Sequence, residues 1–251
     1  MTPVNDVLNP WRDPDPVFSP ARAASDFLGE RELLLLCAPL SVAPTVPRGW
    51  LDAGERIRGE AYRFAADGQR HLLAHGLKRW AISNLLNVSP RDLIFSQNHL
   101  GKPVLHDAAV HFSLSHSADW VAVALYREAS LGVDVEAGRS AMQNPATWPD
   151  ITHPDEPVPE DTGAFLTTWT LKEAISKCSG EGLTMDFRGL SLRASGDQSE
   201  IYRATDGKRH WHAGHEQLDS NTHLAYASMV PWKRVRRRLV LSFGRGDERS
   251  D

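Results

Sequence analysis

The chain has few of the features that mark secreted or membrane-spanning proteins. Its 251 residues include two cysteines, Cys37 and Cys178, which are too few for a disulfide framework and form no CxxC motif. The longest apolar run, residues 33–40, is far shorter than the roughly 20 residues that a membrane-spanning helix needs. The first twelve residues have no apolar stretch behind a basic start, so we expect no signal peptide. These absences predict a reduced, cytoplasmic chain with no membrane partner.

A strong charge of one sign is also absent. The formal net charge is −4, with 24% charged and 41% hydrophobic residues, which is ordinary for a soluble globular protein. A negative balance argues against nucleic acid as a partner held by bulk electrostatic attraction. The length suits one large domain or two small ones.

The periodicity of apolar residues predicts a mixture of helices and short strands. Helices are predicted over residues 51–86, with a break near Asp67–Gly68, and over residues 163–179. Strands are predicted over residues 33–38, 93–95, 110–114, 120–126, 131–135, 187–193, 200–204, 210–215 and 224–230.

The order of these elements indicates an α+β fold made of two halves of similar make-up. A proline-rich linker, residues 140–161, precedes the second long helix. No repeat in the residues themselves proves a duplication. We divide the chain into an irregular N-terminal arm (1–30), an N-terminal half (31–127), a C-terminal half (128–230) and a basic polar tail (231–251).

Two carboxylates stand two residues apart in the predicted strand Gly132-Val133-Asp134-Val135-Glu136. Residues at this spacing point to the same face of a strand. Two neighbouring carboxylates repel each other and favour a bound cation, and hard oxygen ligands suit Mg²⁺. The alternative is a solvent-facing edge strand with no ligand.

A third carboxylate, with a lysine one turn away, lies in the predicted helix that contains Trp169 to Lys177. Glu173 and Lys177 are neighbours one turn apart, which is also the spacing of an ordinary surface salt bridge. A magnesium-bound diphosphate needs both an acidic metal ligand and a cation for the phosphate oxygens. This chemistry is the functional alternative for the pair.

Two shorter segments add polar groups. Phe112 to Ser117 reads FSLSHS, which places small hydroxyls and an imidazole at the end of a strand, where they suit phosphate or nucleotide contacts. Gly101-Lys102-Pro103 predicts a turn that presents one lysine. Each segment is weak evidence when taken alone.

Taken in order, the four segments resemble the surfactin-type 4′-phosphopantetheinyl transferases. That family carries a GKP turn, an F-N-x-S-H-S segment, a G-[IV]-D-[IV]-E strand and a W-x-x-K-E-[AS]-x-x-K helix, and Ser113 here replaces the usual Asn. Residues 63–64 and 67–70 are similar to the family's R-F…D-x-x-R segment. The proline-rich linker is shorter than the helical segment that helps these enzymes receive their carrier protein.

The resemblance implies a pseudo-twofold pair of α+β halves with coenzyme A in the cleft between them. It implies that the phosphopantetheine arm of coenzyme A is transferred to a serine of an acyl or peptidyl carrier protein, which leaves adenosine 3′,5′-bisphosphate. It also implies a monomeric enzyme. The implied magnesium ligands are Asp134, Glu136 and Glu173, and the implied catalytic residues are Glu173, as the base, and Lys177. The implied coenzyme A contacts are Arg63, Arg70, His71, Lys102, Ser115, His116, Lys172 and Lys177.

Two other functions remain open for the same residues. A magnesium-dependent diphosphate hydrolase would use the same three carboxylates, but it has no evident use for the SHS and GKP segments. A non-catalytic homologue that binds coenzyme A or a carrier would not need all of Asp134, Glu136, Glu173 and Lys177. The basic cluster at residues 233–238 is expected to be a solvated tail, with an acidic carrier protein as the alternative partner.

Overall fold

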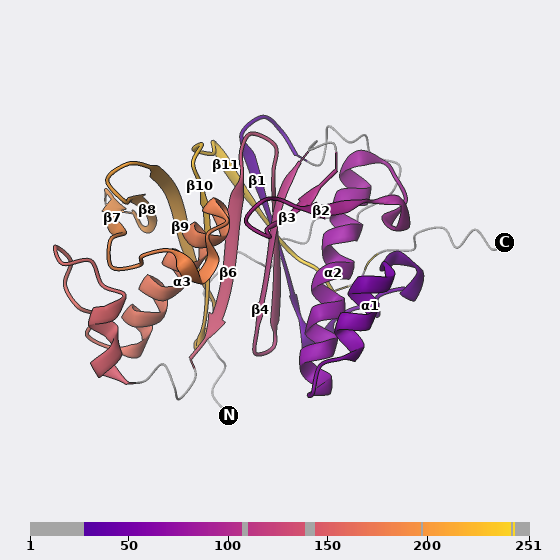
Figure 1. Ribbon diagram of the computed structural model, residues 1–251, viewed down its shortest axis with the longest axis horizontal. Coiled ribbons are helices and arrows are strands. Elements are labelled where there is room, and N and C mark those ends of the chain that lie inside the picture. The colour runs from indigo at the N-terminus through magenta and orange to yellow at the C-terminus, as the bar shows by residue number, and fades with distance from the viewer. Residues whose placement is uncertain (1–27, 107–109, 139–143, 197, 242, 244–251) are drawn as a thin grey trace, which may run out of the picture.

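The computed structural model describes residues 28–106, 110–138, 144–196, 198–241 and 243. Its elements form layers that Figure 1 shows nearly edge-on. Helices α1 (Ala53–Glu60) and α2 (Ala65–Leu86) cover one outer face, helix α3 (Thr162–Ser179) covers the opposite one, and two β-sheets lie between them. The predicted α+β class is confirmed. No helix in these ranges is long and apolar enough to cross a membrane.

The two main sheets contain four and five strands. Each pairing is antiparallel except that of β1 with β11, which is parallel. The first sheet has the order β11 (Arg234–Leu239), β1 (Glu32–Pro39), β5 (Trp120–Tyr126) and β4 (His111–Ser117). The second has the order β6 (Leu131–Ala137), β10 (Thr222–Ser228), β9 (His210–Asp219), β8 (Gln198–Thr205) and β7 (Ser191–Ser195). A two-stranded ribbon joins β2 (Phe95–Gln97) and β3 (Pro103–Leu105).

Strand β1 shows why the sheets pack face to face. Successive side chains of a strand point to opposite faces, and both faces of β1 are buried. Leu34 and Leu36 pack in the core beneath α2. Leu33 and Leu35 pack in a separate core between the two sheets. A continuous apolar run is therefore the expected sequence for this position.

Helices α1 and α3 each begin at a capping residue, and α3 ends at a glycine. Asp52 and Glu55 form a capping box at the start of α1, in which each side chain accepts a backbone N–H of the other residue. Asp161 caps the start of α3, and Gly180 ends it in a left-handed conformation with φ 85°.

The predicted break in the first helical segment is present, but it lies at residues 61–64 and not at Asp67–Gly68. Helix α1 ends at Glu60 and α2 begins at Ala65, so Asp67 and Gly68 lie in the first turn of α2. A Cβ at Gly68 would approach the Gly59 carbonyl oxygen to 2.4 Å. The glycine thus allows the two helices to meet and does not interrupt either of them.

The prediction of a solvated basic tail is wrong for Arg234–Leu239. These residues form β11, which extends the first sheet beyond β1. Arg237 donates from Nε to Glu216 Oε1 at 2.6 Å, so an arginine of this strand contacts the second sheet. Because the chain returns to its first sheet after the second is complete, the two halves are more interwoven than the predicted division implies. The pseudo-twofold relation and the boundary near residue 128 stay predictions, and most of the N-terminal arm lies outside the described residues.

Candidate active site

The site lies where the edge strands β4 and β6 of the two sheets meet. Two serine hydroxyls of the FSLSHS segment, which forms β4, accept hydrogen bonds from backbone N–H groups along the unpaired edge of β6. Ser113 Oγ accepts from the Val133 N–H at 3.0 Å, and Ser117 Oγ accepts from the Ala137 N–H at 3.2 Å. Ser113, which departs from the family pattern, therefore holds the strand that carries the paired carboxylates.

Helix α3 approaches β6 closely enough to add a third carboxylate. A Cβ on Gly132 would lie 1.9 Å from the Ala174 carbonyl oxygen, so only glycine allows this packing. A cavity of about 430 Å³ opens beside the contact. It is lined by Leu114, Ser115, His116, Asp134, Glu136, Trp169, Glu173 and Lys177. The structure thus brings together the three predicted metal ligands, both predicted catalytic residues and two predicted phosphate contacts.

Asp134 is the most constrained member of this group. Its Oδ1 accepts hydrogen bonds from Ser115 Oγ at 2.8 Å and from Lys177 Nζ at 2.7 Å. Its Oδ2 is buried without a hydrogen-bond partner among the described residues. An orphaned buried carboxylate oxygen is costly unless a cation is bound to it.

Glu173 faces this group from α3. Burial raises the pKa of Glu173 to about 6, and the nearby charges of Asp134 and Glu136 add to the rise while Lys177 opposes it. As placed, the described residues contain no three His, Cys, Asp or Glu side chains arranged to hold a metal ion together. A cation at this site would therefore require the carboxylates to converge.

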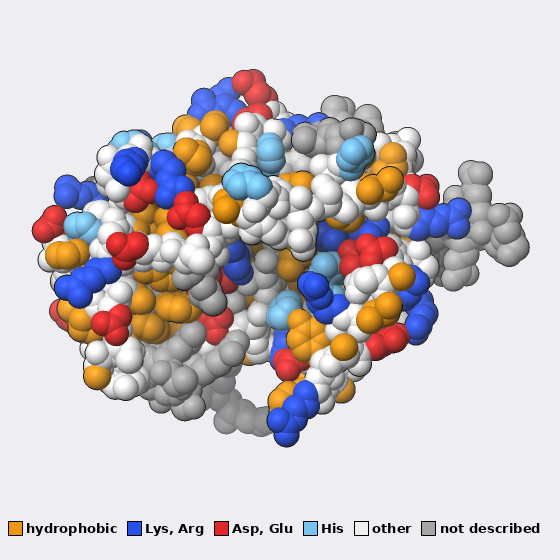
Figure 2. Space-filling view, in the orientation of Figure 1, with side chains coloured by type: hydrophobic (Ala, Val, Ile, Leu, Met, Phe, Trp, Pro, Cys, Tyr) orange, Lys and Arg blue, Asp and Glu red, His pale blue; other side chains and the backbone are white. Residues whose placement is uncertain are grey.

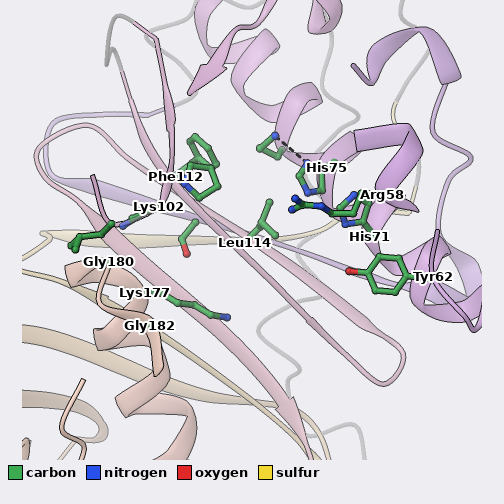
Figure 3. A pocket seen from close by; sticks show the side chains of 15 residues that line it. Arg58, Tyr62, His71, His75, Lys102, Phe112, Leu114, Lys177, Gly180 and Gly182 are labelled. Atoms are coloured by element: carbon green, nitrogen blue, oxygen red, sulfur yellow. Dashed lines mark hydrogen bonds between the residues drawn. The ribbon is translucent and has the colours of Figure 1, made fainter. Parts of the chain in front are cut away.

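A second cavity of about 450 Å³ adjoins the first and shares Leu114 and Lys177 with it. Figure 3 shows Tyr62 and Lys177 pointing towards each other across this space. Its wall on the side of α1 and α2 contains a set of cationic and titratable side chains: Arg58, His71, His75 and Lys78. The opposite wall contains Lys102 and Gly180. The cavity therefore suits an anionic ligand that reaches across from α2 to the end of α3. We call it the cationic cavity, and we call the first one, which Asp134, Glu136 and Glu173 line, the carboxylate cavity.

His116 and His71, two predicted coenzyme A contacts, line different cavities. His116 lies in the carboxylate cavity, and burial lowers its pKa with help from the charges of Arg70 and Lys177. His71 lies in the cationic cavity, where burial lowers its pKa to about 4 and its Nε2 is 3.1 Å from the Glu55 carbonyl oxygen. Both imidazoles are neutral near pH 7, and a neutral imidazole has a single N–H. His116 can donate it to a phosphate, whereas His71 gives its own to the Glu55 carbonyl oxygen and could donate to a phosphate only when protonated.

Lys102 and Lys172 are engaged with the protein itself. Lys102 lines the cationic cavity, but its Nζ donates to Ser130 Oγ and to the Leu131 carbonyl oxygen, each at 2.7 Å. Lys172 is fully buried, and its Nζ donates to three carbonyl oxygens at 2.7–2.8 Å. The three acceptors are those of Ile151, Phe187 and Leu190. The prediction that Lys172 contacts phosphate is therefore wrong, because its ammonium is turned away from both cavities.

The two predicted arginine contacts lie outside the cavities. Arg70 Nη1 donates to the Ala118 carbonyl oxygen at 2.7 Å, and Nη2 pairs with Asp67. Arg63 is exposed, and its guanidinium lies 5.3 Å from the Phe64 ring centroid.

Sequence reasoning missed Arg58, Tyr62 and Lys78 as residues of the cavity wall. The sequence did contain a sign that Lys78 belongs to this wall, because residues 71, 75 and 78 follow the i, i+4, i+7 spacing of one helix face. His75 and Lys78 share the buried Glu55, whose Oε1 lies 2.8 Å from His75 Nδ1 and 2.7 Å from Lys78 Nζ. The ion-paired Glu55 could not be anticipated, because it belongs to a different helix.

The sequence matches known proteins over the same region. The family model of the 4′-phosphopantetheinyl transferase superfamily matches residues 130–227, and that of the 4′-phosphopantetheinyl transferase N-terminal domain matches residues 48–128. The chain belongs to the 4′-phosphopantetheinyl transferase superfamily. The resemblance predicted from the four motifs is thereby confirmed.

Individual transferases of this superfamily are similar to the chain at moderate identity. The 4′-phosphopantetheinyl transferase psf-1 of Bacillus pumilus is 29% identical over 160 residues, which cover 61% of this chain and 67% of the relative. The 4′-phosphopantetheinyl transferase Sfp of Bacillus subtilis is 30% identical over 151 residues, which cover 57% and 66%. A putative 4′-phosphopantetheinyl transferase of Synechocystis is 24% identical over 203 residues, which cover 75% and 82%. The chain thus spans about two thirds of the length of the first two relatives.

Proposed function

We propose that the protein transfers the 4′-phosphopantetheine arm of coenzyme A to a serine of an acyl or peptidyl carrier protein, in a reaction that requires Mg²⁺. One observation carries the proposal. Asp134, Glu136 and Glu173 line a single cavity with Lys177, and this cavity opens into a cationic one. An acidic site beside a basic one suits a metal-bound diphosphate whose nucleotide end is also phosphorylated.

The residues of the carboxylate cavity fit a hard divalent cation. All three proposed ligands supply carboxylate oxygens, the donors that Mg²⁺ prefers. The buried, unsatisfied Oδ2 of Asp134 needs a positive partner, and burial together with the charges of Asp134 and Glu136 raises the pKa of Glu173. Bound there, Mg²⁺ would neutralise charge on the diphosphate of coenzyme A.

The roles of the protein's own residues follow from their positions. Lys177 bridges Ser115 and Asp134 at 2.9 and 2.7 Å, and in the complex its ammonium would contact diphosphate oxygens. His116 would donate an N–H to a phosphate of the nucleotide, and His71 would do so only in its protonated form, because its neutral ring gives its one N–H to the Glu55 carbonyl oxygen. Glu173 would accept the proton of the carrier serine as that hydroxyl attacks the β-phosphate. Adenosine 3′,5′-bisphosphate would leave from the cationic cavity. Catalysis of this kind rests on positioning and charge neutralisation.

We further propose that the enzyme is a cytoplasmic monomer. Cys37 and Cys178 are both free and buried in the structure, which suits a reducing compartment. The site draws its residues from both halves of one chain, so a partner subunit has no obvious part in it.

Mass spectrometry of an apo carrier protein tests the proposed function. We expect the mass of one phosphopantetheine to be added after incubation with the enzyme, coenzyme A and Mg²⁺, and not when Mg²⁺ is replaced by EDTA. The Asp134→Ala variant is the matched control and should add nothing. Release of adenosine bisphosphate without any change in carrier mass would instead identify a hydrolase.

A further inference from the structure

The rim of the cleft beside α1 carries an exposed apolar and basic patch that the proposed chemistry does not use. We define this rim patch as Ile57, Arg58, Tyr62, Arg63 and Phe64. Side chains of Ile57, Tyr62 and Phe64 are 66%, 39% and 60% exposed, although all three are large and hydrophobic. Exposed apolar side chains gathered in one place, with polar neighbours, mark sites of interaction with another protein.

The two arginines of the rim patch have no carboxylate partner among the described residues. Arg63 stacks on Phe64, and Arg58 extends along the wall of the cationic cavity beside His71 (Figure 3). Neighbouring cations are neutralised, since Arg48 pairs with Glu60 of α1 and Arg70 pairs with Asp67 within α2. The rim patch therefore presents two uncompensated positive charges around an aromatic surface.

The other basic cluster of the chain differs in this respect. Arg234 and Arg236 lie 4.0 and 3.4 Å from Glu32, and Arg237 lies 2.6 Å from Glu216. Lys233 lies 3.6 Å from Glu30. Three carboxylates thus offset part of the charge of the five cations at residues 233–238, whereas the two arginines of the rim patch have no such partner among the described residues.

The family resemblance would have the carrier received through the linker, but two of its side chains, Trp148 and Glu156, are turned inward. Trp148, in the 3₁₀ helix Pro145–Asp150, is buried against Phe165 with ring centroids 5.3 Å apart. Glu156 accepts from the Leu192 N–H and lies 4.0 Å from the buried Lys172 Nζ. These two side chains hold the second half together and are not presented to a partner.

A carrier domain is too large to enter the cleft, so it must rest on the rim while its serine reaches Glu173. Tyr62 and Arg58 belong both to the rim patch and to the wall of the cavity that contains Lys177, so the patch is continuous with the active site. Figure 2 shows basic and hydrophobic side chains interspersed along the α1 side of the central hollow.

We propose that the rim patch is the docking surface for the carrier protein, with Arg58 and Arg63 facing acidic residues of the carrier and Tyr62 and Phe64 packing against its apolar side chains. The inference rests on the proposed transferase function and names the surface by which the acceptor is recognised. Arginine and aromatic side chains are the residues that most often dominate the binding energy of protein interfaces.

Steady-state kinetics with a carrier that the wild type modifies tests the proposal. The variants are Arg63→Glu and Phe64→Ser, because neither side chain lines a cavity. Matched controls are Arg91→Glu and Ile94→Ser, at exposed positions of the same half that line neither cavity. We expect each rim variant to raise KM for the apo carrier about tenfold, the size of an interface contact worth about 1.4 kcal/mol. KM for coenzyme A, the melting temperature and the control variants should stay within the small range of ordinary surface substitutions.

Two further measurements test the same surface: the salt dependence of KM for the carrier, and the effect of reversing one charge on the carrier. For the wild type, KM for the carrier should rise with NaCl concentration, and Arg63→Glu should weaken this dependence because the steering charge is gone. A carrier in which one exposed acidic residue is replaced by arginine should regain affinity for Arg63→Glu. An unchanged KM for the carrier, or a rise in KM for coenzyme A as large as that for the carrier, would overturn the docking surface. A wild-type enzyme that modifies no carrier would instead refute the proposed function itself.

Discussion

Lys177 Nζ lies 2.7 Å from Asp134 Oδ1, on the same carboxylate that the proposed Mg²⁺ would need. The pair joins α3 to β6 across the carboxylate cavity. Without a divalent cation, Lys177 is the main neutralising charge beside the buried Asp134. Binding of the metal and the diphosphate would release the lysine from the aspartate and give it a phosphate partner.

This exchange predicts a characteristic behaviour of Lys177→Met. With EDTA present, the variant should melt below the wild type, because removal of one partner leaves a buried carboxylate uncompensated, at a cost of up to about 3–5 kcal/mol. Mg²⁺ should raise the melting temperature of the variant more than that of the wild type, since the metal no longer competes with the lysine. Differential scanning fluorimetry across a Mg²⁺ titration measures both effects. Equal responses of the two proteins would show that Lys177 and the metal do not share Asp134.

Glu173→Gln tests the proposed base separately from the fold. Glutamine keeps the size of the side chain but cannot accept the serine proton, and general-base catalysis contributes roughly 10²–10⁴-fold. We expect kcat to fall by at least about 10²-fold on that scale. The melting temperature in EDTA should rise slightly, because the uncharged side chain relieves repulsion from Asp134. Single-turnover measurement of carrier mass gives the rate. A variant within about twofold of the wild type would exclude Glu173 as the base, since a lost base costs far more.

The part of the site that could be predicted from the sequence is the part in which spacing fixes geometry. The two-residue spacing of Asp134 and Glu136 on a strand, and the one-turn spacing of Glu173 and Lys177 on a helix, predicted shared faces that line one cavity in the structure. Lys172 was misplaced because it is adjacent to Glu173 in sequence but about 100° away around the helix. Its ammonium therefore points away from both cavities and towards the carbonyl oxygens of Ile151, Phe187 and Leu190.

Other features depended on contacts that no local pattern encodes. Strand β11 carries arginines at positions 234, 236, 237 and 238, and two of them pair with Glu32 and Glu216 from elsewhere in the chain. The approach of α3 to β6 depends on Gly132, whose packing role is visible only once Ala174 is placed against it. The general α+β order was recoverable because strands and helices differ in period, whereas the partners of each strand were not.

The corrected position of Lys172 leads to a prediction of its own. Lys172→Met would leave the carbonyl oxygens of Ile151, Phe187 and Leu190 buried without this donor, at about 1–3 kcal/mol for each group left unsatisfied. We expect a strongly destabilised protein, measured by urea unfolding. At a temperature where the variant is still folded, calorimetry should give an unchanged affinity for coenzyme A. A stable variant that binds coenzyme A weakly would restore Lys172 as a phosphate contact.

Glu55 predicts how the protein responds to acid. The side chain is buried, which alone would raise its pKa, but hydrogen bonds from His75 and the charges and hydrogen bonds of Lys78 and Arg79 hold the pKa well below the ordinary value. The unfolded chain therefore takes up a proton at Glu55 near its ordinary pKa of about 4.3, while the folded protein does not. The stability that ionised Glu55 contributes is present above that pH and is lost progressively as the pH falls below it.

The comparison of Glu55→Gln with the wild type isolates this contribution from that of the other carboxylates. Near pH 7 the variant should be less stable by about 3–5 kcal/mol, because Lys78 and Arg79 lose the partner that neutralises them. Below about pH 4.3 the difference should narrow, since only the wild type loses stability by protonating Glu55 in the unfolded state. Glu60→Gln is the matched control on the same helix, because its pair with Arg48 is exposed and its difference from the wild type should be small at every pH. Urea unfolding midpoints of the wild type and both variants, measured from pH 7 to pH 3, give these differences in stability. A difference that stays constant or widens towards low pH would show that Glu55 is not held ionised by the α2 cations.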